Sequence, residues 1–161
     1  MSTPWLVDVR VLCYILEAMS TQGQGRYSPT IMDHFLNPRN VGEIPDADGV
    51  GGTGDPGCGD SLRVWIQVRD NHLTDVRFRC KGCPAAIACA SCMTELAIGT
   101  DLDEASEITD EVVEDALGGL PPEKRHCSNL AADALYNAIM DHIVRACDQG
   151  LRERNPGPAS T

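Results

Sequence analysis

Two runs of alternating apolar and polar residues lie near the middle of the chain. The first covers residues 62–68, the second covers residues 76–80, and the short polar segment 70–72 links them. Alternation with a period of two places every second side chain on the same face of a β-strand. The pattern therefore predicts a β-hairpin with one buried face.

Three further segments have the apolar spacing and the end signals of α-helices. The first begins with Ser-Pro at residues 28–29, a favourable N-cap and first-turn pair, and ends before Pro38. The second begins at Pro84 and ends just before Gly99, which supplies a stop. The last helix is expected over residues 128–147, with its apolar residues on one core-facing side.

Residues 101–115 form an acidic segment with eight carboxylates and no basic residue. An apolar stripe still runs through this part of the chain, made of Leu102, Ala105, Ile108, Val112 and Ala116. We interpret the segment as helical, with the carboxylates on a solvated face. A docking surface for a basic partner is the alternative.

Residues 40–59 have a different composition, with seven glycines, two prolines and few large apolar side chains. This composition is typical of an irregular and mobile loop. We interpret residues 1–26 as an N-terminal extension with a short helix and a linker, and residues 149–161 as a disordered tail. Residues 27–148 are expected to form one globular domain, for which the 42% hydrophobic content of the chain is sufficient.

The formal net charge of the chain is −11 at pH 7. A nucleic acid or an anionic membrane would favour a basic protein surface, so neither is expected as a partner. A basic protein or a metal cation fits the charge better. The longest apolar run, residues 11–16, is also far shorter than the roughly 20 residues that a membrane span needs.

The chain has eight cysteines, a number that four disulfides in a secreted protein would also require. Nothing in the sequence reads as a secretory signal, and the apolar content supports a core without disulfides. The thiols are therefore expected to be reduced and the protein cytoplasmic. A C-x2-C-x5-C-x2-C run is compatible with a zinc site or with core packing, and its short middle spacing favours packing. This run consists of Cys80, Cys83, Cys89 and Cys92.

Three cysteines lie at junctions between predicted elements rather than inside them. Cys58 stands between two glycines before the first strand, Cys83 lies between strand and helix, and Cys127 begins the last helix. The positive end of a helix dipole lowers the pKa of a thiol, which suits metal binding at both helix starts. Asp60 and His126 lie close by in sequence and offer oxygen or nitrogen donors. Such a mixed set holds iron and sulfide less firmly than four thiolates, so the pattern indicates a transiently bound cluster.

Four segments carry a family resemblance: YSPTIMDHFLNPRNVG at 27–42, GCGD at 57–60, GCPAAIA at 82–88 and LPPEKRHCSNLA at 120–131. In these segments the chain resembles the IscU/NifU amino-terminal family of iron-sulfur cluster assembly scaffolds. The resemblance implies an α+β fold, with a small antiparallel sheet of about three strands and helices packed on one face. It also implies a scaffold and cluster carrier rather than an enzyme.

The resemblance further implies partners and cargo. A pyridoxal-phosphate cysteine desulfurase would supply persulfide sulfur, iron would join it, and a transient 2Fe-2S cluster would form before transfer to apo-proteins. Its ligands would be Cys58, Cys83 and Cys127, with Asp60 or His126 completing the shell. A 4Fe-4S cluster and zinc in the purified protein remain alternatives, and the choice between monomer and homodimer stays open.

One departure from the family pattern changes the expected partners. The chaperone-recognition segment of Isc-type scaffolds reads LPPVK, whereas this chain has Glu123 in place of the apolar residue. This acid argues against recognition by an Hsc-type chaperone. The alternative function is a SufU-like, zinc-dependent sulfur acceptor that works with a cysteine desulfurase. The SufU branch lacks the histidine before the third cysteine, so His126 favours the scaffold.

Overall fold

The computed structural model describes residues 27–55 and 59–154. The predicted N-terminal helix and Cys58 lie outside the described residues. The helices and strands follow in the order α2 (Pro29–Leu36), β1 (Gly49–Asp55), β2 (Asp60–Arg69), β3 (His72–Lys81), α3 (Pro84–Ala97), α4 (Leu102–Ser106), α5 (Asp110–Ala116), the 3-10 helix η1 (Pro122–Lys124) and α6 (Arg125–Arg154).

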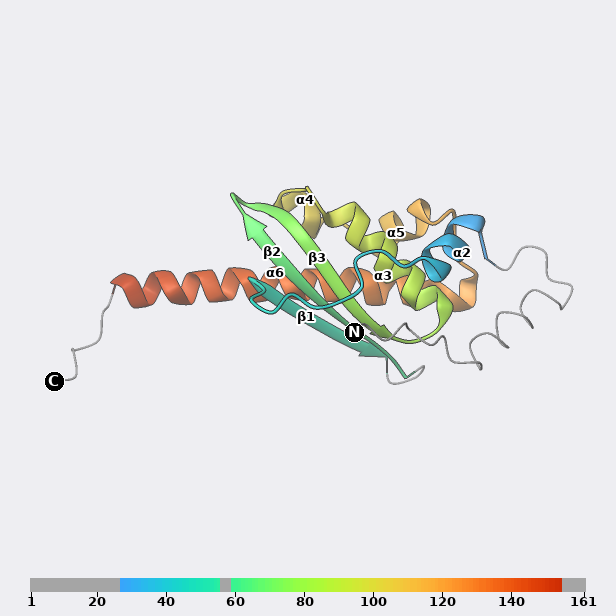
Figure 1. The fold of residues 1–161 in the computed structure, drawn as a ribbon, viewed down its shortest axis with the longest axis horizontal. Coiled ribbons are helices and arrows are strands. Elements are labelled where there is room, and N and C mark those ends of the chain that lie inside the picture. The colour runs from blue at the N-terminus through green and yellow to red at the C-terminus, as the bar shows by residue number, and fades with distance from the viewer. Residues whose placement is uncertain (1–26, 56–58, 155–161) are drawn as a thin grey trace, which may run out of the picture.

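The three strands form one antiparallel sheet in the order β1-β2-β3. Helices α3 and α6 pack against one face of this sheet, while α2 packs on α3 and α5 packs on α6 (Figure 1). Buried side chains from the sheet and the helices make a common core. The predicted α+β fold, with about three antiparallel strands and helices on one face, is confirmed.

The predicted hairpin is confirmed as strands β2 and β3. Leu62, Val64 and Ile66 are at most 3% exposed and face the core, as the alternation predicts. Asp70 and Asn71 form the turn, with φ angles of 50° and 64°. Two consecutive residues in this left-handed region are typical of a type I′ turn, whose twist matches that of the flanking strands. The turn therefore fixes which side chains of the hairpin face the helices and which face away.

The prediction of an irregular loop over residues 40–59 is wrong for its centre, because Gly49–Asp55 forms strand β1. A Cβ atom on Gly49 would lie 2.2 Å from the carbonyl oxygen of Ala138, and one on Gly51 would lie 2.3 Å from that of Ala134. Only glycine allows the backbones of β1 and α6 to approach so closely. The glycines that suggested a loop serve helix-to-strand packing.

The acidic segment forms two short helices, α4 and α5, rather than one. The side chain of Asp101 caps α4, and that of Thr109 caps α5. Because residues 107–109 interrupt the helical register, Val113 is fully buried whereas Val112 is 41% exposed. The predicted apolar stripe is therefore correct for Leu102, Ala105 and Ile108, which are buried, and wrong for Val112 and Ala116, which are exposed.

The last helix is longer than predicted. It runs over Arg125–Arg154 rather than 128–147, so residues 149–154, assigned to a disordered tail, are helical. Gly150 lowers helix propensity without ending the helix. The division of the chain into extension, domain and tail otherwise stays a prediction. Within the described parts of the chain, no helix combines the length and the apolar character that crossing a membrane requires.

Candidate metal centre

Three chain segments meet at one end of the sheet. Asp60 is the first residue of β2, Cys83 is the N-cap of α3, and Cys127 is the third residue of α6. Packing of α3 against both β3 and α6 holds these ends together. Asp60 and Cys127 are buried, whereas Cys83 and His126 are half-buried. The group therefore lies just beneath the surface.

The local sequence explains how Cys83 reaches this position. Pro84 occupies the first turn of α3, where a proline needs no backbone N–H. Gly82 links the end of β3 to this helix, and a Cβ atom there would lie 3.0 Å from both Cγ and Oδ1 of Asp60. Glycine thus lets the strand-to-helix turn pass directly beside the Asp60 carboxylate.

The sulfur atoms of Cys83 and Cys127 are 3.6 Å apart, although 44 positions separate the two residues in sequence. Two thiolates that bind one tetrahedral metal ion at about 2.3 Å would lie roughly 3.8 Å apart. The two thiols therefore have the separation of paired ligands on a single metal.

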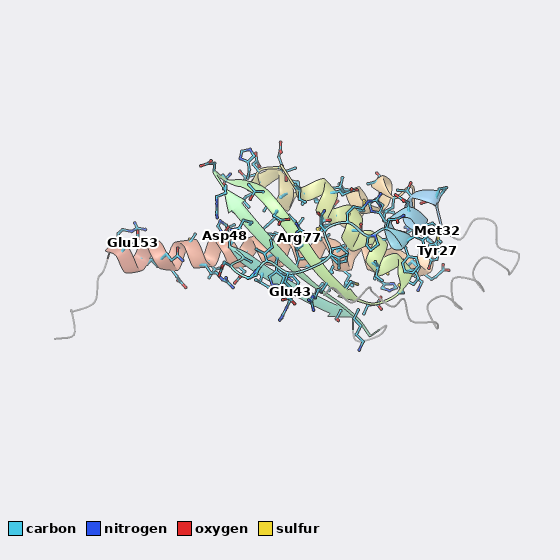
Figure 2. The ribbon with its side chains drawn as sticks, viewed as in Figure 1. Tyr27, Met32, Glu43, Asp48, Arg77 and Glu153 are labelled. Atoms are coloured by element: carbon cyan, nitrogen blue, oxygen red, sulfur yellow. The ribbon has the colours of Figure 1, made fainter. Side chains whose placement is uncertain are left out.

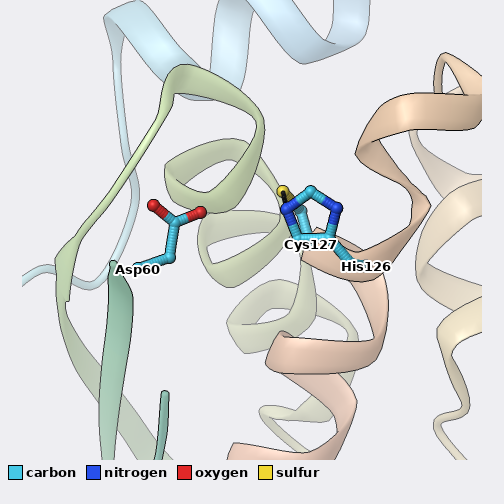
Figure 3. A group of neighbouring side chains, drawn as sticks. All are labelled: Asp60, His126 and Cys127. Carbon is cyan, nitrogen blue, oxygen red and sulfur yellow. Dashed lines mark hydrogen bonds between the residues drawn. The ribbon is translucent and has the colours of Figure 1, made fainter. Parts of the chain in front are cut away.

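Asp60 and His126 add oxygen and nitrogen donors to this pair of thiols. One carboxylate oxygen of Asp60, one ring nitrogen of His126 and the sulfur of Cys127 all lie within 4.8 Å of one another (Figure 3). The Nε2 atom of His126 is 3.5 Å from the Cys127 sulfur. Among the described residues, this is the one set of three such side chains that converges so closely.

The Asp60 carboxylate has an oxygen that its surroundings leave unsatisfied. The side chain belongs to a residue that is only 6% exposed, and its Oδ2 atom has no hydrogen-bond partner among the described residues. An unpaired buried carboxylate oxygen costs free energy, so it commonly indicates an ion or ligand. Together with the neighbouring thiols, this oxygen fits a metal-binding role.

Cys83 is electrostatically prepared to act as a thiolate. The hydrogen bond from the Cys127 thiol is the main cause that lowers the pKa of Cys83, to about 6, against the opposing effect of burial. The backbone N–H of Ala86 and the Lys124 ammonium lower it further. The same sulfur contact, together with burial, raises the pKa of Cys127. One sulfur of the pair therefore carries negative charge near neutral pH, while the other donates its hydrogen to it.

The other cysteines of the C-x2-C-x5-C-x2-C run lie in different surroundings. Cys89 is fully buried and Cys92 is 4% exposed. Burial raises the pKa of Cys80 to about 12 and that of Cys92 to about 11, and it also raises the pKa of Cys89. These thiols, all within the described part of the chain, do not gather three ligand atoms at one point. A zinc site on this run has no support in the structure.

The structure brings four of the five predicted site residues to one end of the sheet: Asp60, Cys83, His126 and Cys127. Cys58 lies outside the described residues. The sequence reasoning missed Gly82, whose missing side chain makes room for the Asp60 carboxylate. The Gly-Cys-Pro string between a predicted strand and helix was a usable signal, because glycine there indicates a close approach.

An α+β fold with thiols, a carboxylate and an imidazole at one end of a three-stranded sheet is an arrangement typical of small metal-binding proteins. A family model described as the NifU-like N terminal domain matches residues 26–148. The chain belongs to this family.

Similar proteins cover most of the chain. Iron-sulfur cluster assembly scaffold protein IscU 1 of Archaeoglobus fulgidus is 56% identical over 117 residues, covering 73% of this chain and 76% of the relative. The IscU scaffold of Aquifex aeolicus is 44% identical over 121 residues, covering 74% of this chain and 77% of the relative.

Solved structures share the fold. FiSufU from Fervidobacterium islandicum AW-1 matches with a TM-score of 0.61 and 25% identity, covering 70% of this chain and 96% of that one. The N-terminal part of a NifU-like protein from Brucella abortus matches with a TM-score of 0.61, covering 74% of this chain and 96% of that structure's chain. Its 22% identity supports the fold alone.

Proposed function

We propose that this protein is an iron-sulfur cluster assembly scaffold, which accepts sulfur and iron, assembles a cluster and passes it to apo-proteins. The observation that carries the proposal is the 3.6 Å approach of the Cys83 and Cys127 sulfurs beside Asp60 and His126. Membership of the NifU-like family and the names of the Archaeoglobus and Aquifex relatives support it. The protein is a carrier rather than an enzyme, and the cluster is its cargo.

The donor set suits a cluster that is built and then released. Thiolates are soft ligands that favour iron-sulfur clusters, whereas carboxylate oxygen and imidazole nitrogen match them less well. Cys83 and His126 are half-buried, so one side of the centre is accessible from solvent. A mixed and accessible ligand shell favours transfer over permanent retention.

The full ligand set and the partners extend this proposal. Cys58, two residues before Asp60 in sequence, is the proposed third thiolate of a transient 2Fe-2S cluster, which Asp60 or His126 completes. The proposed partners are a pyridoxal-phosphate cysteine desulfurase and apo iron-sulfur proteins, and the proposed location is the cytoplasm. Glu123 is exposed in η1, which supports the expectation that an Hsc-type chaperone does not recognise this segment.

Anaerobic reconstitution tests the proposal. The protein is incubated with a cysteine desulfurase, cysteine, ferrous iron and excess dithiothreitol, which reduces the delivered persulfide sulfur to sulfide. We expect visible charge-transfer absorbance that moves to an apo-ferredoxin added afterwards. The control is the Cys127→Ala variant under the same conditions, which should develop no such absorbance. Absence of a chromophore from the unmodified protein would refute the scaffold.

A SufU-like, zinc-dependent sulfur acceptor is the second candidate, because two neighbouring thiols beside a carboxylate and an imidazole also suit zinc. In that case Cys58, Asp60, Cys83 and Cys127 would hold zinc. Zinc content alone does not separate the two functions, since thiolate sites also bind zinc strongly. Persulfide formed on the zinc-loaded protein by the desulfurase, without any chromophore in the presence of iron, would favour this second function.

A further inference from the structure

The face of the sheet that points away from the helices is basic, in contrast to the acidic chain as a whole. Register pairs place Lys81 opposite Ser61 and Arg77 opposite Trp65 on this outward face, and Asp75 is the one acidic residue that β3 itself contributes to it. Figure 2 labels Arg77 on β3 and Glu43 and Asp48 on the segment that precedes β1. Arg77 pairs with Asp75 at 2.9 Å, and Arg69 pairs with Asp48 at 3.2 Å. Five of the thirteen lysines and arginines of the chain belong to the outward positions of β2 and β3, namely Arg63, Arg69, Arg77, Arg79 and Lys81.

A hollow of about 580 Å³ lies over this face, towards the end of the sheet that carries the metal centre. Three basic side chains, Arg63, Arg79 and Lys81, line it together with one acidic side chain, Glu43, and with Trp65 and Gly52, so its lining carries a net positive charge. Gly52 leaves room within the hollow, because the atom nearest to the place of a Cβ there is a backbone oxygen 3.6 Å away. The hollow thus combines positive charge, an aromatic ring and open space.

The charges in this hollow are not arranged for stability. Arg63 and Arg79 are direct cross-strand partners, and like charges in such a pair destabilise a hairpin. Arg79 is paired with Glu43 at 3.1 Å. Arg63 instead lies over the Trp65 ring, 6.0 Å from its centroid, and no carboxylate in the described part of the chain pairs with it. Departures from local stability rules of this kind are expected at functional sites.

We propose that this basic hollow binds an acidic, extended segment of a partner protein. The guanidinium of Arg63 and the ammonium of Lys81 both lack a carboxylate partner among the described residues, so a bound acidic segment would supply one. Charge-assisted hydrogen bonds to arginine are strong and directional. Lys81 is two residues before Cys83, so the bound segment would lie beside the metal centre.

The surrounding charge favours a protein segment over a nucleic acid. Helices α4 and α5 and their caps carry eight carboxylates without a basic residue, and the net charge of the chain is −11. A polyanion that extends well beyond the hollow would be repelled by this field, because nucleic-acid affinity depends on many phosphate contacts. A short acidic segment contacts the basic face alone.

Fluorescence anisotropy with a labelled eight-residue peptide of alternating glutamate and valine tests the proposal. We expect binding with a Kd in the range of tens of micromolar, which weakens as salt rises from about 50 to 300 mM. The peptide with glutamine in place of glutamate should bind at least about tenfold more weakly, because it lacks the charge. Equal binding of both peptides would overturn the proposal, and so would tighter binding of a single-stranded oligonucleotide.

Charge-reversal variants locate the site. Arg63→Glu and, separately, Lys81→Glu should each weaken binding of the glutamate peptide by at least about tenfold. Arg154→Glu, with the same charge change at the exposed end of α6, is the matched control and should bind within about twofold of the unmodified protein. Equal losses in all three variants would mean that net charge alone attracts the peptide, which would overturn the hollow as the site.

The thermal unfolding midpoint of the Arg63→Glu variant separates a binding role of Arg63 from a purely structural one. It places glutamate opposite Arg79, so the thermal midpoint should stay unchanged or rise by about 1–3 °C while peptide binding is lost. The inference is independent of the cluster function. Arg63→Glu should still reconstitute a cluster, so failure of the peptide experiment and failure of the scaffold proposal are separate results.

Discussion

The cysteine at the start of helix α3 and the cysteine in its interior lie in sharply different surroundings. Cys83, at its N-cap, is half-buried, contacts the Cys127 sulfur at 3.6 Å and has a pKa of about 6. Cys89, six residues later, is fully buried among apolar residues, and its pKa is raised. The same side chain on the same helix is therefore a thiol of low pKa and a candidate ligand at one place, and a buried packing residue at the other.

The difference shows that position in the helix, rather than residue type, separates the candidate metal ligand Cys83 from the packing cysteine Cys89. A thiol at a helix start receives backbone N–H groups and the positive end of the dipole, whereas a thiol in the helix interior receives neither. The thiol of Cys127 adds a further hydrogen bond to Cys83. Substitutions at these cysteines and their neighbours test this contrast.

The largest expected effect is on cluster formation. Cys83→Ser should reduce the iron retained after anaerobic reconstitution and desalting by at least about tenfold, because a hydroxyl replaces a thiolate ligand. Cys89→Ala is the matched control and should retain iron within about twofold, because this thiol takes part in packing. An equal loss in the Cys89→Ala variant would contradict the contrast.

The second effect is on thiol reactivity in the metal-free protein. The thiolate is the reactive form, so alkylation of Cys83 by iodoacetamide should rise with pH through about 6 and then level off. Below that pH the thiol is protonated and the rate falls. Cys89 and Cys92 should react about a hundredfold more slowly at pH 7, because both are buried and their pKa values are raised. Mass spectrometry of the labelled peptides measures each site, and a midpoint near 9 for Cys83 would be the contrary result.

A smaller effect concerns cluster lifetime. Asp60→Ala should slow the loss of a reconstituted cluster by about threefold. The reason is that a carboxylate oxygen binds the iron of a cluster less well than a thiolate does, so the Asp60 side chain eases release of the cluster. Decay of the visible absorbance under anaerobic conditions with a chelator measures this lifetime. Asp75→Ala, which removes a carboxylate from the outward sheet face, is the control. Faster loss in the Asp60→Ala variant would show that the carboxylate anchors the cluster.

The smallest effect comes from the Lys124 ammonium, which lowers the pKa of Cys83 less than the Cys127 hydrogen bond does. Lys124→Met should raise the alkylation midpoint of Cys83 by about half a pH unit. Arg154→Met removes a charge far from the centre and should leave the midpoint in place. Identical alkylation midpoints in the Lys124→Met variant and the unmodified protein would show that the Lys124 ammonium does not lower the pKa of Cys83.

Much of the candidate site was accessible from local sequence. Pro84 after Cys83 predicts a helix that starts at this thiol, and the N-cap position is confirmed. The roles of Asp60 and His126 came from sequence proximity and family resemblance, and the structure brings both near Cys127. No local pattern reveals the 3.6 Å contact between two sulfurs 44 positions apart, because the packing of α3 on α6 creates it.

The basic hollow also depends on tertiary structure. The sequence gives a net charge of −11 and points to a basic partner. The register of the hairpin instead gathers Arg63, Arg79 and Lys81 on one face, which fits an acidic partner. A net charge is a sum over the chain, whereas binding depends on which charges share a surface.

The sequence by itself determined the hairpin, the start of α3 and the identity of the candidate ligands, because alternation, turn residues and capping act over a few neighbouring positions. Tertiary structure alone decided that the glycine-rich segment is strand β1. Gly49 and Gly51 are held there by the backbone of α6 at Ala134 and Ala138, more than eighty positions away. Glycine composition favours a loop locally, and only close packing against a distant helix reverses that preference.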